Sequence, residues 1–382
     1  MKIYADNAAT TPVCRAAINA MQTCLNQNYG NPSSIHEAGR LAADVVSSAR
    51  RKIARIINAH ADEIYFTSGG TEADYWAINI AAEIGAKKNK RHIISTAFEH
   101  PAVLKSLDRL KKRGFEITLL PVHGDGIVRA DDLLSVIRDD TALVSLMYAN
   151  NEIGTVQPVS LFAKLCGNRG VLFHTDAVQA AGAVPIDVRN QFIDMLSLSA
   201  HKFHGPKGTG ALFCRQGIPV TALAEGGAQE HGKRAGTENV PGIAGMAAAL
   251  EQSCRNMNVN NAIIMSMRDR LIDALGGIEG SKLNGHEKHR LPGIVNFSFE
   301  GIQAEALLHL LDMAGICASA GSACASGSQD SSHVLLALGL THEIAKSSLR
   351  LSLSAYNTPE EMEYIIQTLP PIIKRLRDMP PV

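Results

Sequence analysis

The 382-residue sequence lacks an excess of charge of either sign, long apolar runs and paired cysteine motifs. Lysine plus arginine and aspartate plus glutamate both number 37, so no overall field draws the chain to nucleic acid or to an anionic membrane. No run approaches the ~18 apolar residues of a membrane span. The first six residues contain no apolar signal core, and we therefore expect a cytoplasmic protein without nucleic-acid or membrane partners.

The seven cysteines are an odd number, are scattered along the chain and contain no Cys-x-x-Cys pair. Neither a disulfide framework nor a zinc knuckle is indicated, and most of these cysteines are expected to be small buried hydrophobes. His201 and His204 stand three residues apart, but no third ligand has metal spacing, so no metal site is predicted.

Apolar residues make up 46% of the sequence, which is enough to form a buried core. At ~150 residues for each domain, the length predicts two domains. Between about Asp62 and Cys214, short β-rich runs alternate with amphipathic stretches, which predicts an α/β domain with a mostly parallel sheet. The seven predicted strands are 64–66, 92–95, 117–120, 142–147, 171–174, 195–198 and 210–213.

The pattern changes after Cys214, where a glycine-rich segment and helices rich in alanine and methionine follow. Strands at 294–299 and 349–353 and helices at 303–311 and 359–376 then predict a small α+β domain. We place the large domain at residues 16–257, and the small domain at 1–15 together with 258–382.

Two polar clusters follow predicted strands of the large domain. Lys202 comes just after one strand and Asp176 ends another, so both are expected at the carboxyl edge where α/β sheets bind ligands. A lone lysine in a polar turn is usually only solvated, but the second cluster weakens that interpretation. An amine for a Schiff base and a carboxylate for a pyridine nitrogen are what pyridoxal phosphate requires.

A phosphate would need a cradle, and residues 66–73 form a strand, a glycine turn and a helix start with free N–H groups. The segment matches neither a Walker loop nor a dinucleotide fingerprint, and alone it is weak support. His100 also follows a strand. Its ring could stack on a planar cofactor, or it could serve only at the start of a helix, and the local sequence favours neither role.

Cys324 differs from the other cysteines because no apolar residue larger than alanine lies within five positions of it. The tract from Ser319 to Ser332 is rich in serine, glycine and alanine and predicts a mobile surface loop. A thiol there is either a reactive group that meets a substrate and then a partner, or a harmless surface cysteine.

Taken together, the motifs resemble the cysteine desulfurases of the NifS/IscS type, within the class V aminotransferases, over nearly the whole chain. The ordered set of motifs is specific: residues 4–11 (YADNAATT), 30–34 (GNPSS), 67–72 (TSGGTE), 99–101 (EHP), 150–154 (NNEIG), 174–179 (HTDAVQ), 199–202 (SAHK), 234–239 (RAGTEN) and 321–324 (GSAC). The resemblance implies a fold-type I pyridoxal-phosphate transferase that releases alanine from L-cysteine.

The resemblance also implies roles for individual residues. Lys202 would hold pyridoxal 5'-phosphate, Asp176 would pair with its ring nitrogen, Gln179 would contact the ring hydroxyl and His100 would stack on the ring. The remaining cofactor contacts would come from Gly70, Thr71, Asn151, Ser199, His201 and, from a neighbouring subunit, Thr237. Asn151 and Arg350 would bind the substrate carboxylate. Cys324 would take the sulfur as a persulfide and pass it to an acceptor protein such as an iron–sulfur scaffold, within a homodimer.

Some residues depart from the family pattern. Ser354-Ala355 replaces a Gly-Arg pair, and Tyr75 is bulkier than usual, so substrate range or loop closure could differ. Cys317 is an added thiol, either a resolving partner for Cys324 or a buried residue at a strand end. Alternatives to the desulfurase reaction are cleavage of selenocysteine, β-elimination from a related amino acid, and a non-catalytic sulfur-relay subunit that retains the fold.

Overall fold

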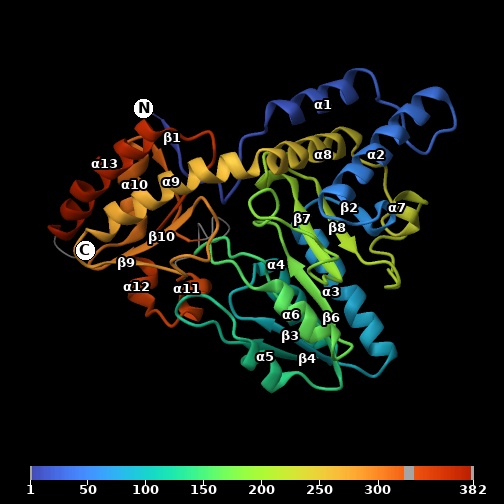
Figure 1. Cartoon of the computed structure of the whole chain (residues 1–382), viewed down its shortest axis with the longest axis horizontal. Helices are drawn as coiled ribbons and strands as arrows, with labels where there is room; N and C mark the ends of the chain where they lie inside the picture. Colours follow the sequence, from blue (N-terminus) through green and yellow to red (C-terminus); the bar gives the residue numbers. More distant parts are fainter. Residues whose placement is uncertain (1, 322–330, 380–382) are drawn as a thin grey trace.

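The computed structural model describes residues 2–321 and 331–379. Its helices and strands divide between a larger and a smaller part, which lie side by side in Figure 1. In chain order the elements of the larger part are α1 (Arg15–Asn26), α2 (Glu37–Ile56), η1 (Ala61–Glu63), β2 (Ile64–Thr67), α3 (Gly70–Lys87), β3 (His92–Thr96), α4 (Pro101–Lys112), β4 (Glu116–Leu120), α5 (Ala130–Val136), β5 (Thr141–Ser145), α6 (Val159–Gly167), β6 (Leu172–Asp176), β7 (Met195–Ser199), η2 (Ala200–Lys202), β8 (Gly210–Cys214), α7 (Gln229–Gly232) and α8 (Val240–Arg255).

The smaller part combines the N-terminal strand with the C-terminal third of the chain, and both termini lie there in Figure 1. Its elements are β1 (Ile3–Tyr4), α9 (Met257–Gly276), β9 (Ser281–Leu283), β10 (Ile294–Phe299), α10 (Ala304–Met313), β11 (Ile316–Cys317), α11 (His333–Ala337), α12 (His342–Lys346), β12 (Ser348–Ser352) and α13 (Pro359–Arg377). These elements enclose a separate core that runs from Ile3 and Ala5 to Met267 and on to Ile373. The boundary at 257/258 itself stays a prediction.

The seven predicted strands form one sheet, in the order β2-β8-β7-β6-β5-β3-β4. Strands β4, β3, β5, β6 and β7 run parallel, and β8 is antiparallel to both of its neighbours. Strands β3, β5, β7 and β8 are buried along their whole length because helices cover both faces of the sheet. The predicted α/β class and the mostly parallel seven-stranded sheet are confirmed.

Helices α2 and α3 of the larger part are buried to different extents. In α2 the buried residues Ala42, Val46, Ala49 and Ile53 recur every three or four positions, which places them along one side. Helix α3 is buried on most of its surface, and it packs against β5, β7 and β8. Its first turn therefore stands over the carboxyl ends of the central strands, where Lys202 and Asp176 also lie.

The small part contains a three-stranded antiparallel sheet in the order β12-β10-β9 and a short parallel pair, β1-β11. The predicted strand at 294–299 and helix at 359–376 match β10 and α13 closely. The surface loop predicted at 319–332 begins with buried residues, because Ser319 and Gly321 are both buried, and residues 322–330 of this tract lie outside the described residues. The Ser319 backbone pairs with that of Arg350, whose N–H donates to the Ser319 carbonyl at 2.6 Å.

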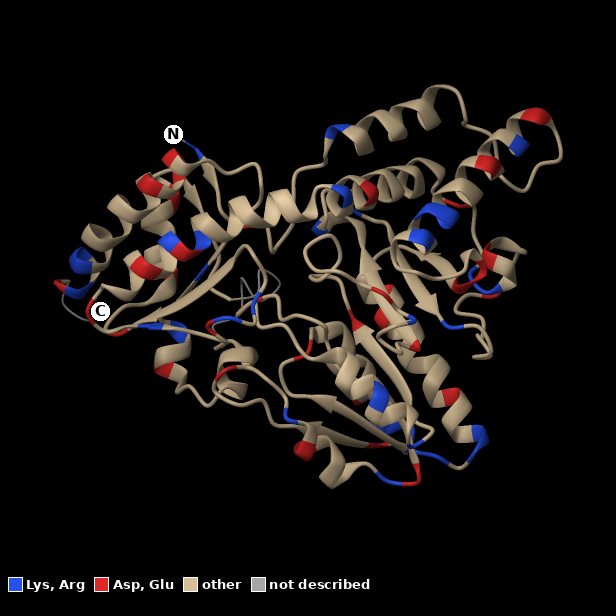
Figure 2. Ribbon diagram, in the orientation of Figure 1, with Lys and Arg blue, Asp and Glu red and all other residues tan. Residues whose placement is uncertain are grey.

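Charged residues of both signs are interspersed over the two parts (Figure 2). In the part of the chain that the structure describes, no helix is long and apolar enough to cross a membrane.

Candidate active site

A cavity of about 200 Å³ lies at the carboxyl edge of the large sheet, and both parts of the molecule line it. Ten of the twelve predicted site residues line this cavity: Gly70, Thr71, His100, Asn151, Asp176, Gln179, Ser199, His201, Lys202 and Arg350. They come from segments up to 280 positions apart in the sequence, and the fold brings these side chains together around one cavity.

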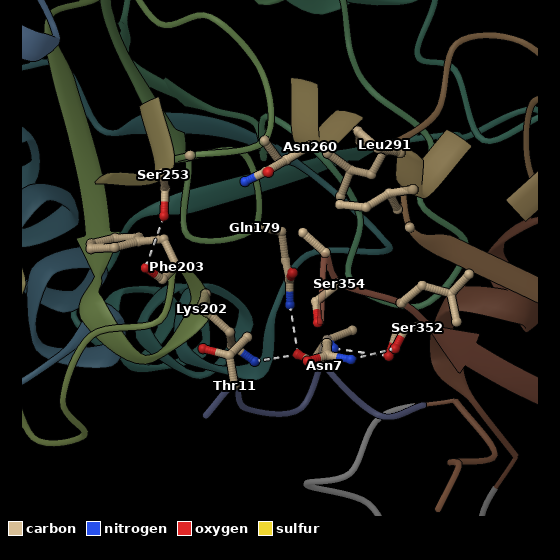
Figure 3. A pocket seen from close by; sticks show the side chains of 18 of the residues that line it. Asn7, Thr11, Gln179, Lys202, Phe203, Ser253, Asn260, Leu291, Ser352 and Ser354 are labelled. Carbon is tan, nitrogen blue, oxygen red and sulfur yellow. Dashed lines mark hydrogen bonds between the residues drawn. The ribbon is translucent and has the colours of Figure 1, made fainter. Parts of the chain in front are cut away.

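Lys202 ends the short helix η2, directly after β7. Its amine donates hydrogen bonds to the carbonyl oxygens of Ala8 and Ala9, the latter at 2.9 Å. Gln179 donates to the same Ala8 carbonyl at 2.8 Å, so the N-terminal segment holds both side chains at the cavity wall (Figure 3). Figure 3 shows a second cavity of about 110 Å³ that shares Ala8, Gln179 and Lys202 with the first.

Asp176 is the last residue of β6 and is 6% exposed. Its Oδ1 accepts a hydrogen bond from the Val178 N–H at 2.9 Å. Burial raises the pKa of the Asp176 carboxyl, and the positive charges available at His100 and Lys202 act in the opposite direction. A cation placed against Asp176 would therefore be stabilised, because it would compensate the cost of a buried negative charge.

His100 combines the two roles that the sequence left open. Its Nδ1 accepts a hydrogen bond from the Ala102 N–H at 3.1 Å, so it caps α4, and the same side chain lines the cavity. Burial lowers the pKa of His100. The Asp176 charge opposes this shift and the Lys202 and His333 charges add to it, and the net lowering favours a neutral ring. A neutral imidazole beside the cavity fits a stacking partner, and stacking itself stays a prediction.

The start of α3 forms a close-packed N-terminus at the cavity. A Cβ on Gly70 would lie 2.6 Å from Val178 Cγ2, and a Cβ on Gly210 would lie 2.7 Å from the Gly69 backbone. The free N–H groups of the first helical turn, with Thr71, Ser199 and His201 around them, make this end suited to an anion. Burial and the neighbouring Lys202 and Lys207 charges lower the pKa of His201 to about 4.

Arg350 comes from β12 of the small sheet and is 1% exposed. Its Nη1 donates to the Asn151 carbonyl oxygen at 3.0 Å, and its Nη2 forms an ion pair with Asp6 Oδ1 at 2.9 Å. Its Nε is buried without a hydrogen-bond partner among the described residues. Arg350 thus presents unused donors to a cavity whose other walls come from the large sheet.

Two predicted residues are not part of this constellation. Thr237 lies before α8 and does not line the cavity of its own chain. Cys324 lies outside the described residues. The residues that flank its segment, Gly321 and Ser332, meet at Glu152: the Ser332 hydroxyl donates to Glu152 Oε2 at 2.5 Å, and a Cβ on Gly321 would lie 2.9 Å from the same oxygen.

Sequence reasoning missed three acidic residues at the site. Asp74 lines the cavity, is 1% exposed and has an Oδ1 without a hydrogen-bond partner in the described chain. Burial, followed by the Asp176 charge, raises the pKa of Asp74 well above its usual value. Asp74 lies four positions after Gly70, about one helical turn, so helical periodicity from the glycine turn could have identified it.

Glu99 and Asp6 are the other two acidic residues that sequence reasoning missed. Glu99 is fully buried behind the cavity, where its Oε1 accepts from the Thr96 hydroxyl at 2.7 Å and the Met147 N–H at 2.9 Å. Burial raises the pKa of Glu99 to about 8. Nearby, burial lowers the pKa of His174 to about 3, so that ring is neutral. No local sequence signal identifies Asp6, because its contact to Arg350 crosses 344 positions.

The chain is similar to known proteins over almost its whole length. The sequence matches the "Aminotransferase class-V" family model over residues 3–365. It is 49% identical to "Cysteine desulfurase IscS" of Methanosarcina thermophila, over 100% of this chain and 94% of the relative, and 48% identical to the protein of that name in Clostridium botulinum, over 100% and 96%. Among solved structures, "NIFS-LIKE PROTEIN" superposes with a TM-score of 0.93 at 37% identity, covering 98% of this chain and 100% of that one. With a family match that spans almost its entire length, the chain belongs to the class-V aminotransferases.

Proposed function

We propose that this protein is a pyridoxal-phosphate-dependent cysteine desulfurase, which converts L-cysteine to L-alanine and transfers the sulfur to Cys324. The observation that carries the proposal is the convergence of Lys202, Asp176 and Arg350 on one cavity. An amine, a carboxylate and a guanidinium there match a cofactor aldehyde, a ring nitrogen and a substrate carboxylate. Relatives that this chain matches over its full length carry the name cysteine desulfurase.

The residues present fit pyridoxal phosphate. Lys202 would bind its aldehyde carbon, Asp176 its ring nitrogen and Gln179 its ring hydroxyl, while His100 would lie against the ring. Gly70, Thr71, Ser199 and His201 would hold the phosphate at the start of α3. When bound, the cofactor supplies an electron-poor ring that stabilises negative charge at the substrate α-carbon.

The substrate carboxylate would bind to Arg350, which is suited to a bidentate contact, with Asn151 beside it. Arg350 stands on β12 of the small sheet and Lys202 on η2, after β7 of the large sheet, so the substrate would bind between the two parts of the molecule. The Lys202 amine then serves as the base that removes the α-proton. Its hydrogen bonds to Ala8 and Ala9 carbonyls keep the amine at the wall of the cavity.

Sulfur transfer is the step assigned to Cys324. Its thiolate attacks the substrate sulfur, a sulfur–sulfur bond forms and the carbon–sulfur bond breaks. The electron pair of the broken bond passes to the substrate β-carbon, which takes up a proton as alanine forms. The Cys324 persulfide then delivers its outer sulfur to a thiol of an acceptor protein. The proposed acceptor is an iron–sulfur scaffold or another sulfur-carrying protein.

We further propose a homodimer as the working form. Large apolar side chains are exposed at the end of α1 and the start of α2: Leu25, Tyr29, Ile35 and Leu41. A second copy that covered them would remove this surface from water. The position of Thr237, away from its own chain's cavity, is consistent with a contribution to the neighbouring site.

The proposal is tested by incubating the purified holoenzyme with L-cysteine and measuring alanine release, intact mass and the peptide that carries added sulfur. We expect alanine together with a mass increase of one sulfur atom on the peptide containing Cys324. Cys324→Ala should abolish the mass increase and lower alanine release at least about a hundredfold, because the sulfur has no nucleophile to attack it. Cys317→Ala is the matched control and should behave as the parent does. Alanine release by Cys324→Ala at the parent rate would refute the persulfide step.

A further inference from the structure

The buried guanidinium of Arg350 has one carboxylate partner among the described residues, and the proposed function gives that partner no task. Asp6 Oδ1 accepts from Arg350 Nη2 at 2.9 Å, while the Asn151 carbonyl accepts from Nη1 at 3.0 Å. The Asp6 side chain is 16% exposed, whereas that of Arg350 is 1% exposed. Asp6 does not line the cavity, so it can reach a ligand there only by acting through Arg350.

We propose that Asp6 is a positioning residue, which fixes the guanidinium plane of Arg350 so that its remaining donors face the substrate carboxylate. A guanidinium has five N–H donors, and the two contacts at Nη1 and Nη2 leave three. One of the three is Nε–H, which is buried and unpartnered in the described structure. An ordered fork with unused donors at the cavity is the arrangement that a carboxylate binds in bidentate geometry. The inference rests on the proposed function, in which Arg350 binds that carboxylate.

Asp6 is not needed to fasten the N-terminal segment. The Asn7 N–H and its side-chain amide donate to the Ser352 carbonyl at 3.1 and 2.9 Å, and the Ala8 N–H donates to Ser352 Oγ at 2.9 Å. Asn357 adds a bond to the Tyr4 carbonyl at 3.0 Å. The bonds from Asn7 to Ser352 appear in Figure 3. Because the backbone beside Asp6 is held by these four bonds, its carboxylate is available to orient Arg350.

The charge balance around Arg350 also supports a positioning role for Asp6. A buried cation without a partner is costly, so a guanidinium with no carboxylate beside it would turn toward solvent or other acceptors. Glu152 is also close enough to Arg350 to sense its charge, but burial raises the pKa of Glu152, and its Oε2 already accepts a hydrogen bond from Ser332. Asp6 therefore compensates the positive charge and keeps Arg350 in place before any substrate arrives.

The test compares three variants as holoenzymes. Asp6→Ala removes both the charge and the acceptor, Asp6→Asn keeps an acceptor oxygen, and Asn357→Ala loosens the same segment without touching Arg350. We expect Asp6→Ala to raise KM for L-cysteine about tenfold, with kcat within about threefold of the parent. A tenfold rise corresponds to ~1.4 kcal/mol, the size of one hydrogen bond to a charged group. Asp6→Asn keeps an acceptor oxygen but loses the charge, so it should raise KM by an intermediate amount, about fivefold. Asn357→Ala should keep KM within about threefold.

A binding measurement separates this inference from the proposed function. L-Alanine carries the same α-carboxylate, and its binding is followed by the change in absorbance of the bound cofactor. We expect Asp6→Ala to weaken L-alanine binding about tenfold, and this result would support the positioning role even if cysteine were not turned over. An unchanged KM and alanine affinity in Asp6→Ala would overturn it. So would an Asn357→Ala variant that loses as much affinity as Asp6→Ala, because the effect would then belong to the segment.

Discussion

Three carboxyl groups in or directly behind the cavity cannot all be ionised at the same time. Asp74, Asp176 and Glu99 are buried within electrostatic range of one another, and the Asp176 charge raises the pKa of both other carboxyls. One negative charge can be compensated by a cation held against Asp176. The basic group beside Asp74 is His174, whose Nε2 lies 3.7 Å from Asp74 Oδ1, and burial lowers the pKa of His174 to about 3, so this ring supplies no positive charge. The arrangement therefore favours an ionised Asp176 and a neutral Asp74 in the loaded enzyme.

Replacing each aspartate by asparagine distinguishes these two states. Asp74→Asn should leave the affinity for pyridoxal phosphate and the rate of alanine release within about threefold of the parent, because an uncharged group replaces an uncharged group. Asp176→Asn makes the same chemical change in the same cavity and should lower the rate on the order of a hundredfold. That loss reflects about 3 kcal/mol, typical of breaking a buried charge pair.

The measurements are titration of the apoprotein with pyridoxal phosphate and the rate of alanine release at saturating L-cysteine. Equal losses in the two variants would show that Asp74 is ionised, contrary to the assignment made from its burial.

The sequence predicted which residues belong to the site better than it predicted which residues contact one another. Lys202 and Asp176 could be placed at one sheet edge from the sequence because each follows a buried strand. Asp6 could not be paired with Arg350 in this way, since no periodicity relates the ends of a chain that meet only through the fold of the small sheet. Glu152, which does not line the cavity, could not be paired with Ser332 and Gly321 for the same reason, because these positions are 180 and 169 residues away in the sequence.

At the level of elements, the junction of β2 and α3 determines how closely a ligand can approach the backbone. Gly70 begins α3, and an added Cβ would lie 2.6 Å from Val178 Cγ2 and 3.5 Å from Ser199 Cβ. Valine is stiff about χ1, so Val178 cannot easily turn away. The glycine therefore permits the helix start, the end of β7 and the turn after β6 to meet at the cavity.

Gly70→Ala should weaken binding of pyridoxal phosphate to the apoprotein at least about tenfold and destabilise the fold by about 1–3 kcal/mol, as overpacking does. Gly124→Ala is the control, because a Cβ at Gly124 would meet no atom within 4 Å. Affinity is measured by absorbance titration, and stability by denaturation in urea. A Gly70→Ala protein that bound the cofactor as tightly as the parent would show that this junction has room to adjust.

Elements with a strong periodic signal were predicted well, and short elements were not. Several strands of the large sheet, among them β3, β5, β7 and β8, are buried on both faces, which distinguishes them from the helices between them. Strands β1 and β11 contain two residues each and β9 three, too few for a pattern to be visible. Their pairing depends on the tertiary approach of residues 3–4 to 316–317, which the local sequence does not encode.

For the molecule as a whole, buried carboxyls make stability depend on pH. Glu99 is fully buried, and its pKa rises from 4.5 to about 8 in the folded protein, chiefly through burial. Because the folded state holds this proton more tightly than the unfolded state, the contribution of Glu99 to the free energy of unfolding is fully present below pH 4.5. It is lost as pH rises toward 8. The loss is on the order of 3–5 kcal/mol over that window, at ~1.4 kcal/mol for each pH unit.

Glu99→Gln should remove this part of the pH dependence while keeping an acceptor oxygen for Thr96 and Met147. The free energy of unfolding of the parent apoprotein is expected to fall between pH 5.5 and pH 8.0 by more than that of the variant, measured from urea denaturation at both values. Glu279→Gln changes an exposed carboxyl and should follow the parent. Parallel pH profiles for parent and Glu99→Gln would mean that Glu99 is ionised in the folded chain. In that case a second negative charge would lie behind Asp176, and the single-charge account of the cavity would be wrong.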